Sequence, residues 1–304
     1  PKPGLKAQHL HIIKTLTKLF KADTHGADLD SQEITFAPNK DSIESAHYAV
    51  DMQTAGSIGL FLQTLLPLGV FKSGGLTLSI VGGTAGLGQV PVEHYPRCLL
   101  PVLFRFGVKA EVKIIRYGYY PVGAGEVSVS ISPGKNLKAI SLTRQGTLQR
   151  ISGISVASQD LIIRDVCQRQ AKAAEDVLKQ QYNCPITIQA QYVDTRSPGT
   201  EINLYAHTRA RCILSADSRG EKSRPAEEVG AAAAKILQTQ LNSQAGCDAH
   251  CADNIIPWLV LLGGEITASE ITTHTKTNMW VAEQFFGKIF TIEDNRIKCE
   301  KITV

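Results

Sequence analysis

Hydrophobic positions along the chain follow two spacings, and each spacing predicts one kind of element. Apolar residues three or four positions apart predict helices, whereas strict alternation predicts strands. We expect helices at 5–21, 56–71, 95–106, 161–182, 226–241 and 253–262. We expect strands at 33–37, 76–81, 110–116, 126–132, 151–157, 186–193, 201–206, 212–216 and 268–273. Because the two kinds alternate, the chain is predicted to have an α/β or α+β fold built from βα units.

A change of composition marks off residues 147–217 from the rest of the chain. The long helix expected there is rich in Gln, Lys and Ala, and the strands around it form a self-contained pattern. Short polar connections at both ends favour an insertion. We therefore expect a large domain formed by 1–146 and 218–304, with 147–217 as a small inserted α/β domain.

His274 lies where the strand-like segment 268–273 gives way to a helix that we expect to begin near Thr277 and Asn278. Thr275, Thr277 and Asn278 are all good N-cap residues, and the free amides and positive dipole end of a helix start form an anion site. A phosphate group is predicted to dock there. The same positive end disfavours a further positive charge, so a neighbouring imidazole keeps a nucleophilic nitrogen. The plainer interpretation is that His274 only helps to cap the helix.

The overall composition restricts the class of protein. The 304 residues are 43% hydrophobic, enough for a large core, and the net charge of +4 permits a polyanionic partner without establishing one. Seven scattered cysteines suggest reduced thiols, and the pair Cys247 and Cys251 lacks the second pair of a zinc site. No apolar stretch is long enough to cross a membrane, so we expect a cytoplasmic protein, or a nucleoplasmic one in a eukaryote. The chain opens at Pro1 without a methionine, and we expect that residues preceded it.

Several polar or glycine-rich positions have more than one interpretation. The glycine-rich turn 82–89 lacks the ending of a P-loop and is compatible with an ordinary turn, and the loop 118–125 is compatible with a hairpin connection. Asp253 stands where an apolar helix is expected to begin, which makes an N-cap role the default. Gln63 lies within the apolar helix 56–71, where a buried amide needs hydrogen-bond partners.

Six separated groups of residues together resemble the RNA 3′-terminal phosphate cyclase family over nearly the whole chain. They are Lys2-Pro3-Gly4-Leu5 with Gln8-His9-Leu10; Thr54-Ala55-Gly56-Ser57 with Leu62-Gln63-Thr64; Gly82-Gly83-Thr84; Gly118-Tyr119-Tyr120-Pro121 with Gly123 and Gly125-Glu126-Val127; Gly220-Glu221-Lys222 with Ala226-Glu227-Glu228-Val229-Gly230; and Ala252-Asp253 with His274-Thr275-Lys276-Thr277-Asn278. The resemblance implies a large domain of repeated βα units, each a four-stranded sheet with two helices, and a small α/β insert matching 147–217. It also implies ATP-dependent conversion of RNA 3′-phosphate ends into 2′,3′-cyclic phosphates.

The resemblance also implies roles for individual residues. His274 corresponds to the nucleophile that takes AMP from ATP. The ATP site is bordered by Gln63, Pro91, His250, Cys251, Ala252, Asp253 and Asn254, with Pro91 against the adenine and Asp253 near the ribose or a metal. Contacts with the phosphates or the RNA end are expected from Gln8, His9, Thr275, Thr277 and Asn278. The implied cofactors are ATP and a divalent cation, Mg or Mn, and we expect the insert to contribute nothing to the transfer at His274.

The chain departs from the family pattern at a few positions. The usual first strand and its glycine-rich turn, which come before Lys2, are absent, and Ala85, Ala124 and His250 replace the residues that the family prefers. One alternative is a catalytically silent cyclase-like protein that binds RNA in ribosome assembly, which would be free to lose His274. A sugar-phosphate or enolpyruvyl transferase is a third interpretation, but no cluster of arginines and lysines marks its site.

Overall fold

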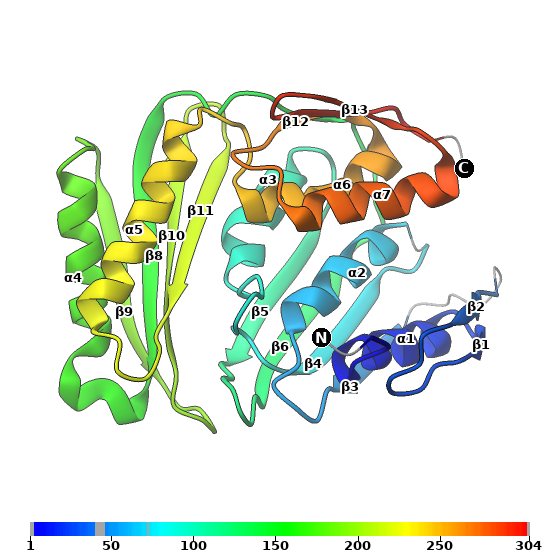
Figure 1. The fold of residues 1–304 in the computed structure, drawn as a ribbon, viewed down its shortest axis with the longest axis horizontal. Helices are drawn as coiled ribbons and strands as arrows, with labels where there is room; N and C mark the ends of the chain where they lie inside the picture. Colours follow the sequence, from blue (N-terminus) through cyan, green and yellow to red (C-terminus); the bar gives the residue numbers. More distant parts are fainter. Residues whose placement is uncertain (1–2, 40–45, 72, 303–304) are drawn as a thin grey trace. The chain divides into compact units, whose positions relative to one another are not determined.

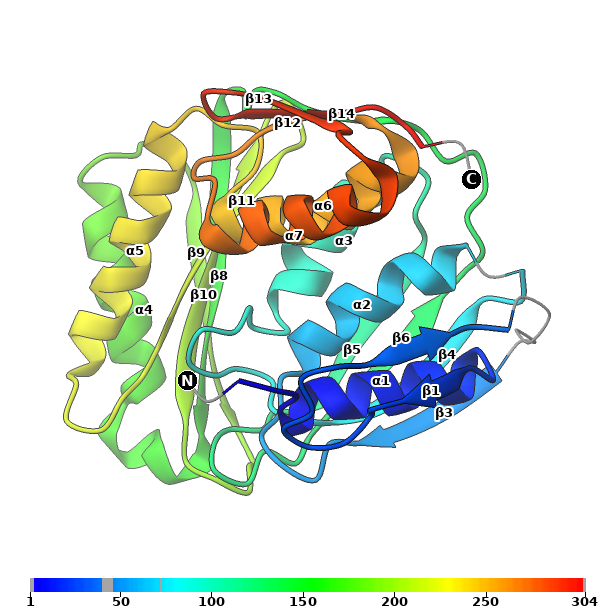
Figure 2. The same ribbon diagram turned by 45° about the vertical axis from the view of Figure 1, so that its right-hand side comes forward.

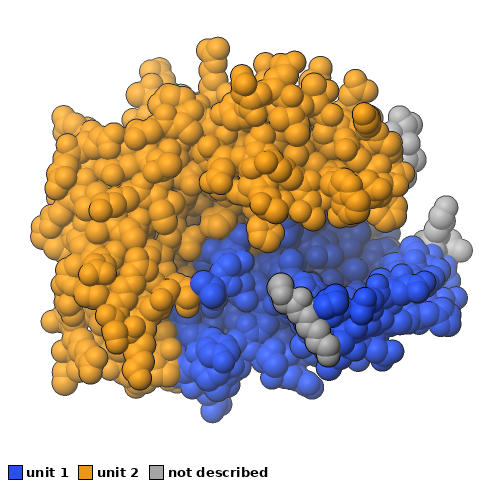
Figure 3. Space-filling model, viewed as in Figure 1, with its two compact units in different colours: residues 1–92, 109–134, 195–197 blue, residues 93–108, 135–194, 198–304 orange. Residues whose placement is uncertain are grey.

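The computed structural model describes residues 3–39, 46–71 and 73–302, so Lys2 of the first motif lies outside the described residues. The chain forms two compact units (Figure 3). Unit 1 comprises residues 1–92, 109–134 and 195–197, and unit 2 comprises 93–108, 135–194 and 198–304. None of the described helices has the length and apolar character needed to cross a membrane.

Unit 1 is built on the sheet β3-β4-β6-β5. Its strands are β3 (Ala46–Asp51), β4 (Leu76–Gly82), β5 (Ala110–Arg116) and β6 (Gly125–Ile131), and its helices are α1 (Ala7–Leu19) and α2 (Ile58–Val70). The short strands β1 (Asp23–His25) and β2 (Thr35–Ala37) form a separate ribbon. Apolar residues on nearly every side of α2, such as Phe61, Leu65 and Leu66, are buried, which explains why the helix reads as hydrophobic throughout.

The first sheet of unit 2 has the order β11-β10-β8-β9. Its strands are β8 (Leu148–Ser158), β9 (Ile186–Val193), β10 (Thr200–Thr208) and β11 (Ile213–Arg219). The helical segments that accompany this sheet are the 3-10 helix η2 (Gln159–Arg164), α4 (Val166–Lys179) and α5 (Ala226–Asn242). The two long helices lie side by side on this sheet (Figures 1 and 2). Since α5 follows residue 217 and packs on α4, β10 and β11, the expected block 147–217 does not contain every element of this layer.

The second sheet of unit 2 has the order β13-β14-β12-β7. Its strands are β7 (Ile140–Leu142), β12 (Gly264–Thr267), β13 (Phe290–Glu293) and β14 (Arg296–Cys299), and its helices are α6 (Ala249–Leu262) and α7 (Thr273–Phe286). The remaining helical segments of the unit are the π-helix η1 (Tyr95–Leu99) and α3 (Leu100–Phe104).

The three four-stranded sheets formed by the described residues share one pairing pattern. Each has a parallel pair at one edge, namely β3 with β4, β8 with β9, or β7 with β12. The other pairs of each sheet are antiparallel. These small mixed sheets with their helices confirm the predicted α/β (α+β) class.

Several predicted boundaries were wrong. The helix expected at 161–182 is broken at Asp165, whose φ of 49° lies in the left-handed region and separates η2 from α4. The strand expected at 268–273 lies at Gly264–Thr267 instead. The helices expected to start at 253 and near 277 start at Ala249 and Thr273. In both cases the helix begins with a polar or small-residue turn that carries no apolar periodicity.

Candidate functional site

His274 is the second residue of α7. Thr272 caps the helix, because its Oγ1 accepts a 3.0 Å hydrogen bond from the backbone N–H of Thr275. The predicted caps near Thr277 and Asn278 were therefore wrong by one helical turn. The His274 side chain is exposed and, among the described residues, makes no hydrogen bond or ion pair. A helix start presents unbonded N–H groups, so the imidazole lies in the first turn of α7, at the end that favours anions, and the predicted docking of a phosphate there stays a prediction.

Asp253 holds the start of α7 against α6. One carboxylate oxygen, Oδ1, accepts hydrogen bonds from the hydroxyls of Thr272, at 2.7 Å, and Thr275. The side-chain amide of Asn278 donates to the backbone carbonyl of Asp253 at 3.2 Å. Thr275 is fully buried in this network, whereas the Thr277 hydroxyl donates to a backbone carbonyl on the outside of the helix. A negative charge at a helix N-terminus also stabilises the helix dipole.

The default interpretation of Asp253 as an N-cap was wrong, because Asp248 caps α6. Its Oδ1 accepts the backbone N–H of Cys251 at 2.8 Å. Its Oδ2 accepts the backbone N–H and the hydroxyl of Ser215, at 2.7 and 3.0 Å. Ser215 belongs to β11, so a strand of the expected insert fixes the start of α6.

Two histidines beside this cap differ in charge at neutral pH, because the pKa of His250 is raised and that of His94 is lowered. His250 is hydrogen-bonded through Nε2 to Asp217 of β11 at 3.0 Å. Burial works against its charge, but the hydrogen bond and charge of Asp217, together with Asp248 and Asp253, raise the pKa of His250 to about 9. His94 is almost fully buried, and burial lowers its pKa to about 4. Its Nδ1 lies 3.0 Å from the Ser215 hydroxyl, and its ring meets His250 edge to face.

The other residues predicted from α6, namely Cys251, Ala252 and Asn254, are all buried. The amide of Asn254 accepts a 3.0 Å hydrogen bond from the Tyr95 hydroxyl and donates to the His250 carbonyl. Cys251 and Ala252 are buried as whole residues. Hydrogen bonds with the buried thiols of Cys247 and Cys98 lower the pKa of Cys251. All seven cysteines are free, as expected for reduced thiols.

One group of described side chains has the spacing of a metal site, and it is not the predicted one. A ring nitrogen of His94, the sulfur of Cys98 and a carboxylate oxygen of Asp248 lie within 4.8 Å of one another, all buried. Nitrogen and sulfur donors do not suit Mg²⁺, and the Asp248 oxygens already accept several hydrogen bonds. Asp253, the predicted metal candidate, does not belong to this group.

The remaining predicted residues belong to unit 1. Gln8 accepts a 3.4 Å hydrogen bond from the backbone N–H of Ser57, the N-cap of α2, and His9 beside it is exposed. Gln63 is half-buried on α2, and Pro91 is buried. The structure thus gathers His250 to Asn254 and His274 to Asn278 in unit 2, and Gln8, His9, Gln63 and Pro91 in unit 1.

The glycine motifs of unit 1 meet backbone against backbone. Thr84 exchanges hydrogen bonds with Gly118 through its hydroxyl, which donates at 3.2 Å and accepts at 3.1 Å. A Cβ on Gly123 would lie 2.7 Å from the Cα of Ala55, and one on Gly83 would lie 2.6 Å from the Ala55 carbonyl oxygen. The glycines are therefore required for close packing between three of the motifs.

Sequence reasoning missed His94, Ser215, Asp217 and Asp248. Ser215 and Asp217 alternate with apolar residues along β11, which is the pattern of a strand with one polar face and could have identified both. Asp248 precedes the backbone N–H that it binds by three residues, which is N-cap spacing. No local signal marked His94, because its partners come from distant segments.

Comparison with known proteins agrees with the motif pattern. A family model described as RNA 3′-terminal phosphate cyclase matches residues 1–292. A protein named RNA 3′-terminal phosphate cyclase from Pyrococcus furiosus is 39% identical over 96% of this chain and 84% of its own length. Proteins of the same name from Pyrococcus abyssi and Caldivirga maquilingensis are each 37% identical, over 100% and 99% of this chain and 87% and 86% of their own lengths.

Proposed function

The chain belongs to the RNA 3′-terminal phosphate cyclase family, and on this basis we propose that it uses ATP to convert RNA 3′-phosphate ends into 2′,3′-cyclic phosphates. The observation that supports this proposal best is the exposed imidazole of His274 at the start of α7. A nucleophile for phosphorus needs an accessible nitrogen and donors for the phosphate oxygens. The first turn of α7 offers both.

In the first proposed step, a ring nitrogen of His274 attacks the α-phosphorus of ATP. A P–N bond forms, the bond to the bridging oxygen breaks, and the electron pair leaves with pyrophosphate. In the second step, an oxygen of the RNA 3′-phosphate attacks the same phosphorus, and the P–N bond breaks to return the histidine. The 2′-hydroxyl then attacks the 3′-phosphorus, loses its proton, and displaces AMP.

Asp253 is a positioning residue in this proposal. Its carboxylate holds Thr272 and Thr275, and these two residues set where α7 begins and hence where the His274 ring stands. The cation at His250 adds positive charge on α6, which favours the polyphosphate of ATP. We propose that Gln63, Pro91 and the segment 250–254 border the nucleotide, and that Gln8, His9, Thr275, Thr277 and Asn278 serve the phosphates or the RNA end.

A divalent cation would neutralise the triphosphate, and we propose that Mg²⁺ or Mn²⁺ enters with ATP. The buried group of His94, Cys98 and Asp248 does not have the oxygen donors that such a cation prefers. We therefore assign the three proposed steps of the transfer to this protein's own side chains and to ATP.

The decisive experiment is incubation of the full chain with α-labelled ATP, followed by a search for an acid-labile, base-stable protein–AMP adduct. We expect labelling of the wild type and its loss in His274→Asn. The control His25→Asn changes an exposed histidine on β1 and should keep full labelling. Undiminished labelling of His274→Asn would place the nucleophile elsewhere.

The alternative of a silent RNA-binding protein predicts a different result. The wild type would then bind RNA but form no adduct, and a 3′-phosphorylated oligonucleotide would be recovered unchanged after incubation with ATP. Cyclisation of that oligonucleotide, detected by its resistance to phosphatase, would exclude the silent alternative.

We also propose that the inserted domain extends beyond the predicted range 147–217. Sheets β3-β4-β6-β5 and β7-β12-β14-β13 have the same topology, because each places its strands in the order first, second, fourth, third along the chain. In each sheet the first two strands are parallel and are joined through a helix. In the second of these sheets, the elements from β8 to α5 interrupt the connection between β7 and α6. An insert that runs from about 147 to 242 keeps α5 with the helix and strands that it covers.

A further inference from the structure

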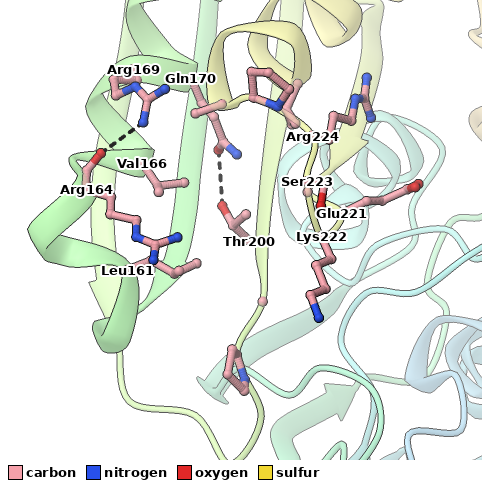
Figure 4. Close-up of a pocket in the computed structure, with 16 residues that line it drawn as sticks. Leu161, Arg164, Val166, Arg169, Gln170, Thr200, Glu221, Lys222, Ser223 and Arg224 are labelled. Carbon is pink, nitrogen blue, oxygen red and sulfur yellow. Dashed lines mark hydrogen bonds between the residues drawn. The ribbon is translucent and has the colours of Figure 1, made fainter.

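Unit 2 contains a pocket with a volume of about 630 Å³ that the proposed chemistry at His274 does not use (Figure 4). Its walls are the first turns of α4 and α5, the end of η2, and the loops 198–200 and 220–225. The second of these loops carries the motif Gly220-Glu221-Lys222, and the start of α5 carries Ala226 to Gly230. Both segments belong to the family pattern, and the proposed transfer at His274 uses neither of them.

The two helices that begin at the pocket, α4 and α5, run in the same direction. Arg169 near the start of α4 binds Glu227 at the start of α5, at 2.7 and 2.8 Å, and further along Gln238 donates to the carbonyl of Val177. Gly230 permits this approach, because a Cβ there would lie 2.1 Å from the carbonyl oxygen of Gln170. The N-cap residues of the two helices, Asp165 and Pro225, make no side-chain cap, and the Tyr192 hydroxyl accepts the N–H of Cys167 on α4. Two positive dipole ends, with the N–H groups that remain, therefore converge on one cavity.

The charged side chains around the pocket are mostly cations. Arg164, Lys222 and Arg224 line it, and none of the three forms an ion pair with a carboxylate among the described residues. The guanidinium of Arg224 donates to the Ser218 hydroxyl and to backbone carbonyls, which holds its positive charge in place. The lining carboxylate Glu221 is paired with Arg219 at 3.0 Å. An excess of unpaired cations favours an anionic ligand.

The floor of the pocket contains a buried amide with an unused donor. Gln170 is fully buried, and its Oε1 accepts hydrogen bonds from Ser155 at 2.7 Å and Thr200 at 3.2 Å. Its Nε2 has no partner among the described residues. A buried donor without a partner is destabilising, and a ligand that accepts the hydrogen bond would remove this penalty. This donor is a second observation, independent of the helix ends, that points to a ligand.

We propose that this pocket binds a phosphate-bearing nucleotide of the RNA strand. The cations and helix ends receive the phosphate, the apolar side chains of Leu161, Val166 and Pro225 pack against the sugar or base, and Gln170 offers a hydrogen bond. A volume of about 630 Å³ is in the range of small-ligand sites and suits one nucleotide. The inference rests on the proposed function only in taking RNA as the source of the nucleotide.

The test measures binding of a fluorescent 3′-phosphorylated oligoribonucleotide to the full chain over a series of salt concentrations. We expect Lys222→Ala and Arg164→Ala each to weaken binding about three- to tenfold and to reduce the salt slope by about 0.7, the value for one lost contact with single-stranded nucleic acid. Lys235→Ala removes an exposed cation from α5 outside the pocket and should change the affinity less than twofold.

Two further measurements separate this inference from the proposed function. The protein–AMP adduct forms without RNA, so both pocket variants should label to the wild-type level with α-labelled ATP. Unchanged RNA affinity in Lys222→Ala and Arg164→Ala would overturn the pocket assignment while adenylylation stands. Absence of the adduct in the wild type, with RNA binding still dependent on these cations, would overturn the transfer chemistry and leave the pocket. Competition by inorganic phosphate alone at the oligonucleotide's own concentration would identify a small-anion site and overturn the RNA assignment.

Discussion

Asp253 on α6 accepts a 2.7 Å hydrogen bond from Thr272, the residue that caps α7. The contact joins two motifs that are separated in sequence, and it fixes the helix end at which His274 stands. The Thr272 side chain, two residues before His274, can therefore control the position of the His274 ring without touching a substrate.

Thr272→Ala should test this control. Loss of an N-cap costs about 1 kcal/mol of stability, and here it also removes one donor to Asp253. We expect a reduced rate of His274 labelling by ATP that Thr272→Ser largely restores. Thr239→Ala removes a hydroxyl that donates to a backbone carbonyl of its own helix, α5, far from the proposed site residues in sequence, and serves as the control. Equal labelling rates for all three variants would refute a positioning role for the cap.

The free energy of unfolding should depend on pH through two histidines with opposite signs. Burial lowers the pKa of His94 from 6.5 to about 4, so the stability contributed by its neutral ring is complete above about pH 6.5 and is lost as the pH falls towards 4. Burial opposes the charge of His250, yet Asp217 raises its pKa to about 9, so its contribution is complete below pH 6.5 and is lost as the pH rises through 9.

Urea unfolding at pH 4.5, 6.5 and 9 would measure both effects. His250→Gln should differ from the wild type least at pH 9, and His94→Phe should flatten the decline on the acid side. For His94 the full effect is on the order of 3 kcal/mol. Identical pH profiles for the wild type and both variants would contradict these charge states.

Replacing 147–217 with a short flexible linker should destabilise the remainder of the chain. The replacement leaves α5 without α4 and removes Ser215 and Asp217, the partners of Asp248 and His250. Replacing 147–242 avoids the first defect but not the second. We expect faster hydrogen exchange at the start of α6 in both variants and aggregation chiefly of the shorter replacement. Wild-type protection of α6 in either variant would show that the insert and the site are independent, as the sequence had suggested.

Gly123→Ala should cost more stability than Gly88→Ala. Both glycines have positive φ, at 71° and 65°, so an alanine is strained at either position. Only at Gly123 does the new Cβ meet backbone, 2.7 Å from the Cα of Ala55, whereas nothing lies within 4 Å at Gly88. The difference between the two variants in thermal unfolding measures the packing of the glycine motifs. A difference near zero would mean that the turn 118–125 can move away from Ala55 freely.

The sequence predicted the kinds of element well because apolar spacing reports which face of an element is buried. It placed β9 and β5 at their observed bounds. Helix starts were harder to predict. Between 247 and 254 three side chains can cap a helix. Asp248 is the one that does so, by accepting the Cys251 N–H, and Ser215 supplies the donors to its second carboxylate oxygen. That choice depends on contacts between distant segments, which spacing does not encode.

Contacts between distant segments also limited how much of the site could be predicted. The motif around His274 was recognisable as a local pattern, but the partners of His250 and His94 come from β11. The pocket at the starts of α4 and α5 was equally hidden, because the break at Asp165 that creates the second helix start occurs within a continuous helical pattern.

The parallel pair of β7 and β12 has a consequence for how the chain folds. Ile140 pairs with Gly264, so this sheet closes only after a long stretch of intervening chain has been brought together. Loop-closure entropy grows with the logarithm of loop length, and such non-local pairs slow folding. The segment in between can shorten the search by folding first, because Gln145 donates a 2.8 Å hydrogen bond to the Leu241 carbonyl and so joins its two ends. Closure of the sheet beside which α7 and His274 stand therefore depends on two strands that are far apart in the sequence.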